Sequence, residues 1–249
     1  MNTLNSADLS QAVMARITPF FEEVLKDHAG SVHSIHVVGS AVTPDFNAKK
    51  SDINSVVVLK EMDLKFVEFL APLGKKFSKN GLSAPLIMTP DYLRTSVDVF
   101  PIEFLDFKLL HRTVFGDDIF GFITIDKPHL RLQCEREIKT KLIGLRQGYL
   151  STYGKKSYLT PVLAKFITGS MALFRAIITL FDQDPPAKRL DVVKTLGSAT
   201  GTETEIFEKL LLLKNEELKP SEDELHRMFE DCYQAIEAIG IIIDSHQSS

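Results

Sequence analysis

The sequence predicts an α+β protein in which a mixed β-sheet with helices is followed by an all-α helical bundle. Runs rich in β-branched residues alternate with helical periods as far as Asp126, whereas only helical periods follow Pro128. The 249 residues are enough for two domains of ordinary size. We therefore expect one domain over residues 1–126 and a second over residues 127–249.

The elements of the N-terminal half follow from periodicity and from the residues that end each run. A helix is predicted from Leu9 to about His28, because apolar residues recur there every three or four positions. Asp63 is expected to cap a second helix that reaches Phe77. Strands are predicted at residues 32–38, 53–59, 86–88 and 102–107, the last bounded by Pro101.

The C-terminal half is predicted to hold five helices with short connections, which is typical of an up-and-down bundle. A nearly all-apolar helix is expected to begin at Thr160-Pro161 and to run through Phe181 as the central helix. Thr202 with Glu205 and Ser221 with Glu224 have the spacing of capping boxes. The helices are predicted at about 134–149, 160–181, 187–196, 203–214 and 222–242.

Composition excludes several classes of protein. The hydrophobic fraction of 44% and the charged fraction of 25% are ordinary for a globular chain, and the net charge of −4 argues against binding to extended nucleic acid.

The cysteines and the absence of a recognised targeting segment indicate the compartment. Cys134 and Cys232 lie within apolar periods and are expected to be buried thiols in a reducing compartment. No targeting segment is recognised in Met1–Asp8, and Lys165 and Arg175 interrupt the most apolar stretch. We therefore expect a cytoplasmic protein without a membrane span.

The most informative stretch joins two predicted strands. Val37-Val38-Gly39-Ser40 is followed by eleven residues and then by Asp52-Ile53-Asn54. Residues two apart on a strand point to the same side, so Asp52 and Asn54 are expected to project together beside the Gly-Ser turn. A polar pair in an apolar strand costs desolvation energy unless a partner meets it. This pattern predicts a ligand site.

These residues resemble the signature of the nucleotidyltransferases of the DNA polymerase β type, in particular the small prokaryotic kind with a C-terminal helical domain. Their pattern is an apolar strand, Gly-Gly or Gly-Ser, about ten residues, and then Asp-x-Asp or Asp-x-Glu. A third carboxylate follows on a later strand. The match covers about residues 30–107, and the helical half fits by architecture.

The resemblance implies a role for each matching residue. Gly39 and Ser40 would bind the phosphates of a nucleotide, and Asp52 would bind Mg²⁺ or Mn²⁺. Asn54 stands where the second acid of the family would be. For the third acid we favour Glu103, which lies between apolar neighbours near the start of a predicted strand. The other two candidates are Asp98 and Asp106.

Asn54 is the departure from the family pattern. Its carbonyl oxygen can bind Mg²⁺ but brings no negative charge, so metal binding should be weaker. Three alternatives stay open at this point: a site with one metal, a nucleotide site without fast chemistry, and an inactive enzyme.

The implied function is Mg²⁺-dependent transfer of a nucleoside monophosphate from an NTP, with ATP the first choice, to a hydroxyl group in a cleft between the domains. The acceptor, a small molecule or a protein, is not indicated by the sequence, and a homodimer remains open. The alternative is a weakly active or inactive nucleotide-binding module whose helical bundle binds a partner, as a regulator or a toxin–antitoxin component.

Other polar residues are interpreted as structural. Lys49 and Lys50 fit a solvated loop better than a phosphate site. His33 and His36 lie on opposite faces of one strand without a nearby cysteine, which disfavours a zinc site. His111-Arg112 is expected on a surface helix, and Gly116-Asp117-Asp118 is expected to form a turn.

Overall fold

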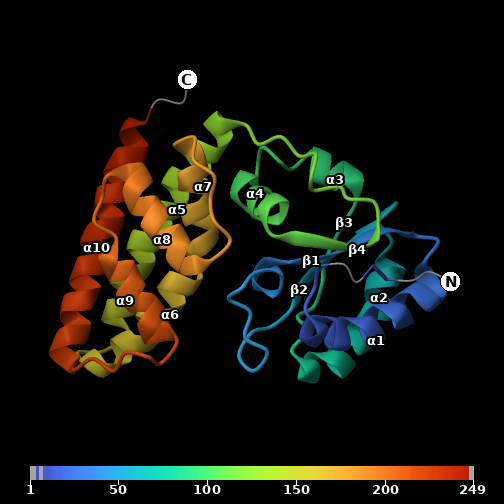
Figure 1. The fold of residues 1–249 in the computed structure, drawn as a ribbon, viewed down its shortest axis with the longest axis horizontal. Coiled ribbons are helices and arrows are strands. Elements are labelled where there is room, and N and C mark those ends of the chain that lie inside the picture. The colour runs from blue at the N-terminus through green and yellow to red at the C-terminus, as the bar shows by residue number, and fades with distance from the viewer. Residues whose placement is uncertain (1–3, 6–7, 247–249) are drawn as a thin grey trace. The chain divides into compact units, whose positions relative to one another are not determined.

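The computed structural model describes residues 4–5 and 8–246 (Figure 1). They form two compact units. The first comprises the described residues as far as Phe100 together with Phe104–Thr124, and the second comprises Pro101–Glu103 and the described residues from Ile125 onward. Part of the stretch in which no targeting segment is expected, residues 1–3 and 6–7, lies outside the described residues.

The first unit is built on a four-stranded mixed sheet with the order β3-β2-β1-β4. Strand β1 pairs antiparallel with both β2 and β4, whereas β2 and β3 pair in parallel. The N-terminal mixed sheet expected from the sequence is therefore confirmed. The strands span Val32–Val38 (β1), Asn54–Leu59 (β2), Leu86–Met88 (β3) and His111–Gly116 (β4).

Helices α1 (Gln11–His28) and α2 (Leu64–Phe77) lie on one face of this sheet (Figure 1). Both are amphipathic, and their apolar sides join Ile35, Val37 and Val57 of the strands in one buried core. Asp63 caps α2 as expected, because its Oδ1 accepts a hydrogen bond of 2.9 Å from the amide of Lys65. Strand alternation turns the neighbouring side chains of β1 toward the opposite face.

The predicted strand at residues 102–107 is wrong. These residues form helix α4 (Pro101–Leu109), with proline at its start. The residues Ile102 and Leu105 are buried, as are Pro101 and Phe104, and a spacing of three between buried positions is typical of a helix.

Two other elements also differ from the prediction. The expected surface helix at His111-Arg112 is instead strand β4, and Pro90–Arg94 forms a short helix, α3, which the sequence did not predict.

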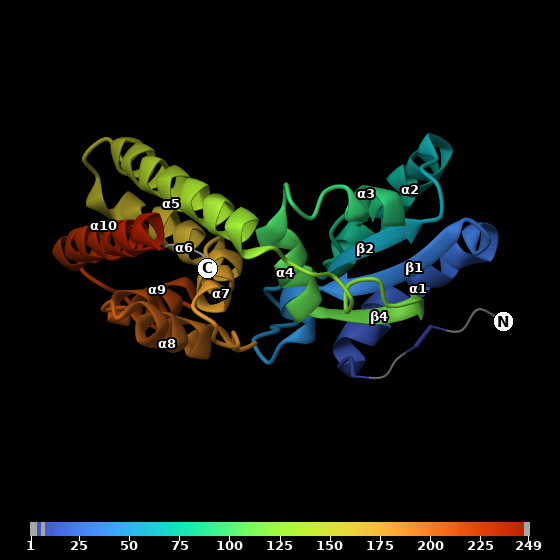
Figure 2. The same ribbon diagram turned by 90° about the horizontal axis from the view of Figure 1, so that it is seen from above.

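The second unit is a helical bundle, as expected. Figure 2 shows α5 on one side of α6 and α7, with α8 and α9 on the other side. Together with α10 this makes six helices from residue 127 to residue 246, where the sequence predicted five. They span Lys127–Leu150 (α5), Leu159–Thr168 (α6), Met171–Leu180 (α7), Arg189–Thr200 (α8), Glu205–Lys214 (α9) and Glu222–Ser245 (α10).

The additional helix arises because the expected central helix is broken. Helices α6 and α7 are bent by 43° relative to one another at Gly169-Ser170. The Ser170 hydroxyl donates a 2.7 Å hydrogen bond to the carbonyl oxygen of Phe166, and the Ser170 amide bonds to Ile167 three residues back. A Gly-Ser pair of this kind is a common cause of a kink.

One of the two predicted capping boxes is present. Ser221 and Glu224 exchange both hydrogen bonds at the start of α10. The prediction for Thr202 is wrong: α9 starts after Thr204, and the Thr202 hydroxyl lies 2.6 Å from that of Thr200. Gly201 ends α8 in a left-handed turn, and Thr202 lies two residues before Thr204, which directly precedes α9.

Both cysteines are buried and free, as expected, and burial raises the pKa of each thiol. Within the described part of the chain, no single helix has the length and apolar composition of a membrane span. Only the bent pair formed by 156–168 and Met171–Leu180 reaches that composition.

Candidate functional site

Gly39 ends β1 and opens a short 3₁₀ turn, Gly39–Val42, as the sequence predicts for this position. Its φ of +72° lies in the left-handed region, which glycine adopts without strain. A Cβ atom built here would have nothing within 4 Å, so the backbone is open to an approaching ligand. The amide of Gly39, however, donates to the carbonyl oxygen of Leu110 at 2.9 Å. The Gly39 amide is therefore already paired within the fold, and any ligand of this turn would be bound by the groups that follow Gly39.

Asp52 and Asn54 lie at the start of β2 and are both exposed. Asn54 is the first residue of the strand and pairs with Val38, directly before the Gly-Ser turn. Asp52 precedes the strand, and its Oδ1 would lie 3.8 Å from a Cβ atom built on Gly81. The carboxylate therefore extends toward the segment that precedes β3.

Asp52 lines a pocket of about 650 Å³ that belongs entirely to the first unit. Three segments form it: the first turns of α1, the loop before β2, and the turn after α2. Its charged residues are four cations and one carboxylate, and an excess of positive charge attracts polyphosphates. The lining comprises Ala15, Arg16, Ala48, Lys49, Lys50, Ser51, Asp52, Ser78, Lys79, Asn80 and Gly81.

Arg16 holds one wall of this basic pocket. Its Nη2 donates to the carbonyl oxygen of Ala48, which ties α1 to the lysine-containing loop. Its Nη1 would lie 3.0 Å from a Cβ atom built on Gly81, so a side chain there would displace the guanidinium slightly. The loop with Lys49 and Lys50, which the sequence favours as a solvated segment, is thus part of a concave and positively charged surface.

Glu103 does not lie on a strand. It occupies the first turn of α4 and is assigned to the second unit, whereas Asp52 belongs to the first. Its Oε2 accepts a 2.8 Å hydrogen bond from Nε2 of Gln133, whose Oε1 accepts a 2.7 Å bond from the amide of Ile102. Gln133 is buried, so these bonds satisfy polar groups that would otherwise be unpaired. The Glu103 carboxylate is therefore hydrogen-bonded to Gln133 as part of the packing of α4 against α5.

The strands themselves supply no further acid. Among the described residues, none of β1 to β4 contains Asp or Glu. The oxygen donors of the motif are therefore the Asp52 carboxylate and the Asn54 carbonyl. By number, two hard oxygen donors would suit one Mg²⁺ or Mn²⁺ ion rather than a pair of such ions. Of the two residues, Asp52 lines the basic pocket and Asn54 does not.

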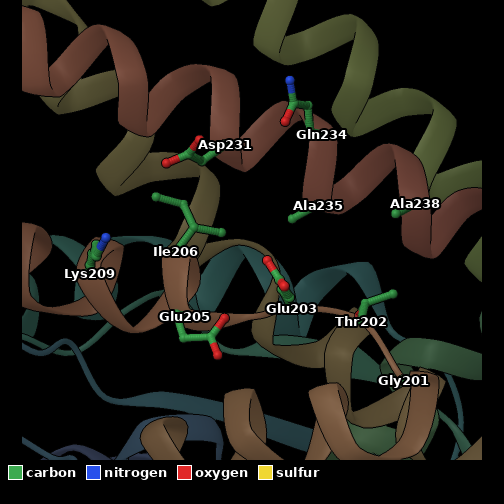
Figure 3. A pocket seen from close by; sticks show the side chains of 10 residues that line it. All are labelled: Gly201, Thr202, Glu203, Glu205, Ile206, Lys209, Asp231, Gln234, Ala235 and Ala238. Carbon is green, nitrogen blue, oxygen red and sulfur yellow. The ribbon is translucent and has the colours of Figure 1, made fainter.

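A second pocket, of about 560 Å³, lies within the helical unit between α9 and α10 (Figure 3). Glu203, Glu205 and Asp231 face it together with Lys209, so carboxylates outnumber cations by three to one. Such a surface repels polyphosphates. Of the two pockets, the basic one beside Asp52 is the better candidate for a nucleotide.

Comparison with known proteins supports the fold. No family model and no curated protein matches the sequence. The structure is similar to the crystal structure of spectinomycin adenyltransferase AAD(9) from Enterococcus faecialis with ATP and spectinomycin. The TM-score is 0.51 with 12% sequence identity, over 88% of this chain and 98% of that chain. The chain therefore has a nucleotidyltransferase-type α+β fold.

Proposed function

We propose that this chain is a nucleotidyltransferase that binds a nucleoside triphosphate, ATP first of all, and transfers its nucleoside monophosphate to a hydroxyl group of a small molecule. The observation that carries the proposal is the basic pocket that Asp52 lines just before β2. The fold gives independent support, since it is similar to that of an adenyltransferase whose structure contains ATP and spectinomycin.

Each group of residues has a distinct task. Lys49, Lys50 and Lys79 balance the charge of the triphosphate, and Arg16 holds the loop that carries two of these lysines. Asp52 and Asn54 would hold one Mg²⁺ or Mn²⁺, which neutralises phosphate charge when it is bound. The acceptor oxygen then forms a bond to the α-phosphorus, the bond from that phosphorus to pyrophosphate breaks, and the hydroxyl proton is lost to solvent.

A second candidate is a nucleotide-binding module without transfer activity. Two observations favour it: Asn54 removes one negative charge from the motif, and the Glu103 carboxylate accepts a hydrogen bond from Gln133. Both candidates require the same nucleotide site, so binding and transfer need separate tests.

Binding is tested by calorimetry with ATP in the presence and absence of Mg²⁺. Lys49→Ala and Lys79→Ala should each weaken ATP binding roughly tenfold, equivalent to about 1.4 kcal/mol, because each removes a cation from the pocket. Lys75→Ala is the matched control, since Lys75 is exposed on α2 but does not line the pocket. Equal ATP affinity in all three variants and the wild type would remove the nucleotide site from this pocket.

Transfer is tested by pyrophosphate release from ATP with a panel of hydroxyl-bearing small molecules that includes spectinomycin. Asn54→Asp is nearly isosteric and restores the missing charge, so it should tighten Mn²⁺-dependent ATP binding and increase release. Asp52→Ala should abolish both. ATP binding without release in the wild type and in Asn54→Asp would favour the non-catalytic module.

A further inference from the structure

A cluster of three potential metal ligands lies in the first unit, away from Asp52 in the sequence and outside the basic pocket. His36 on β1, His111 on β4 and Asp118 just after β4 each offer one ligand atom, and these atoms all lie within 4.8 Å of one another. Strand pairing brings them together, because β1 and β4 are neighbours in the sheet. Sequence alone disfavoured zinc at His36 and placed Asp118 in a turn, because the two histidines of this cluster are 75 positions apart in the chain.

The contacts of His111 fit either a proton or a metal ion between its ring and Asp118. Its Nδ1 lies 2.8 Å from the carbonyl oxygen of Phe107, which can only accept, so Nδ1 carries a proton. In the neutral ring, Nε2 then carries no proton, and its lone pair faces Asp118 Oδ1, which lies 3.0 Å from Nε2. Two acceptors at this distance need a proton or a metal ion between them. A histidine that donates its other N–H to a backbone carbonyl is the usual arrangement of a metal ligand.

Asp118 is held as a carboxylate in a fixed orientation. Oδ1 accepts 3.0 Å hydrogen bonds from the amides of Phe120 and Gly121. These two amide hydrogen bonds favour the ionised form of the Asp118 carboxyl group. The side chain is 43% exposed and that of His111 is 12% exposed, so an ion can reach the pair from solvent.

His36 supplies the third donor. Its ring is fully buried, with Nε2 2.8 Å from the Ser34 hydroxyl and Nδ1 2.9 Å from the Thr113 hydroxyl. A neutral imidazole has one ring nitrogen that carries a proton and one that carries a lone pair, and the second can bind a metal ion. One of the two hydroxyls donates its hydrogen bond to the lone pair of His36. A metal ion could replace that hydrogen bond, because a hydroxyl can rotate and donate or accept elsewhere.

Phe120 forms an apolar wall beside both rings. Its ring centroid lies 4.7 Å from that of His36 and 5.5 Å from that of His111. An apolar wall limits competing water and fixes the orientation of the imidazoles, as is typical around protein metal sites.

We propose that His36, His111 and Asp118 bind one divalent transition-metal ion, with Zn²⁺ the best fit. Two imidazoles and one carboxylate suit Zn²⁺ or Co²⁺ and disfavour Mg²⁺ and Ca²⁺, which prefer oxygen ligands. Three protein ligands leave one tetrahedral position for water or another ligand. This site is distinct from the oxygen donors Asp52 and Asn54 and does not depend on nucleotide binding.

The site nevertheless lies at the same end of β1 as the Gly-Ser turn. Val38 pairs with Asn54 on one side and with His111 on the other, and residues directly opposite one another share a face of the sheet. His111 and Asn54 are therefore two strand spacings apart, or about 10 Å.

The test is titration of chelator-treated, nucleotide-free protein with Co²⁺ and Zn²⁺. We expect one ion per chain, a visible Co²⁺ absorption band typical of four-coordinate sites, and displacement of Co²⁺ by Zn²⁺ but not by Mg²⁺. Asp118→Asn retains an oxygen that accepts the same two amide hydrogen bonds but loses the charge, and it should weaken Zn²⁺ binding roughly tenfold or more. His111→Gln should do the same.

Two controls separate this site from surface binding. Asp117→Asn changes the neighbouring acid, and His129→Gln changes an exposed histidine of the second unit, so both should bind Zn²⁺ as the wild type does. Circular dichroism confirms that each variant is folded. Equal Zn²⁺ affinity in the wild type and Asp118→Asn, or no four-coordinate Co²⁺ band in the wild type, would overturn the proposal. Either result leaves the proposed ATP site unaffected.

Discussion

Gly39 and Gly116 have the same backbone angle but different surroundings. Both have a φ of +72°, which a side chain tolerates poorly. A Cβ atom on Gly39 would meet nothing within 4 Å, whereas one on Gly116 would lie 2.0 Å from the carbonyl oxygen of His33 and 2.9 Å from Cα of Ser34. Conformation alone therefore requires glycine at position 39, and the close approach of β1 requires it at position 116 as well.

The two alanine substitutions should differ in their effect on stability. Gly116→Ala should lower the free energy of unfolding by about 3 kcal/mol or more, because strain and a clash with backbone add together. Gly39→Ala should cost about 1 kcal/mol, from strain alone. Urea denaturation measures both. Similar losses in the two variants would show that the backbone of β1 moves away from position 116 at little cost.

At the scale of a single helix, the capping motif at Ser221 can be compared with the one at Thr202, which does not form a cap. The spacing of Ser or Thr with Glu three residues later is present in both cases. At Ser221 the backbone is extended and the reciprocal bonds form. Near Thr202 the chain has just left α8 through Gly201, and the helix begins only after Thr204. The motif therefore forms a cap at Ser221, where the helix starts directly after it, and not at Thr202, where the helix starts two residues later.

Removal of the hydroxyl at each position tests this difference. Ser221→Ala should lower the free energy of unfolding by about 1 kcal/mol, because it leaves an amide of the first turn of α10 without its acceptor. Thr202→Ala should cost less than about 0.5 kcal/mol, since it removes one bond between two hydroxyl groups. The shift of the urea midpoint reports both changes. A larger loss at Thr202 would contradict the conclusion that its hydroxyl does not cap α9.

Division into two units is the main feature of the whole molecule. The second unit resumes at Ile125, close to the predicted boundary between residues 126 and 127, and it also takes in Pro101–Glu103. Each unit has its own buried core: one lies between the sheet and α1 with α2, and the other lies among the helices of the bundle. Separate cores of this kind allow separate unfolding.

Calorimetry of the full chain should therefore show two unfolding transitions. Gly116→Ala should lower the midpoint of one transition, and Ser221→Ala should lower the midpoint of the other, because the two residues belong to different units. A single transition that both variants shift together would mean that the units unfold as one cooperative body.

The candidate site was predictable only in part. Local sequence was sufficient to place Gly39 and Ser40 in a turn after β1 and Asp52 and Asn54 at the start of β2, because these segments lie close together in the chain. Their roles as site residues stay a prediction. The role of Glu103 depended on a strand that is a helix in the structure, where the carboxylate accepts a hydrogen bond from Gln133. The basic pocket was missed because it combines three segments that are distant in sequence, and charge in a loop does not reveal concavity.

The sequence by itself determined the class of the fold, the helices with a clear apolar period, three of the four strands, the cap at Ser221 and the burial of both cysteines. These features depend on residues within one or two turns of each other. Tertiary structure decided the rest: the helix at Pro101–Leu109, the pairing of β4 with β1, and the meeting of His36, His111 and Asp118. The physical reason is that periodicity records which side of an element is buried, whereas strand order and the contacts between distant segments are set by how the elements pack.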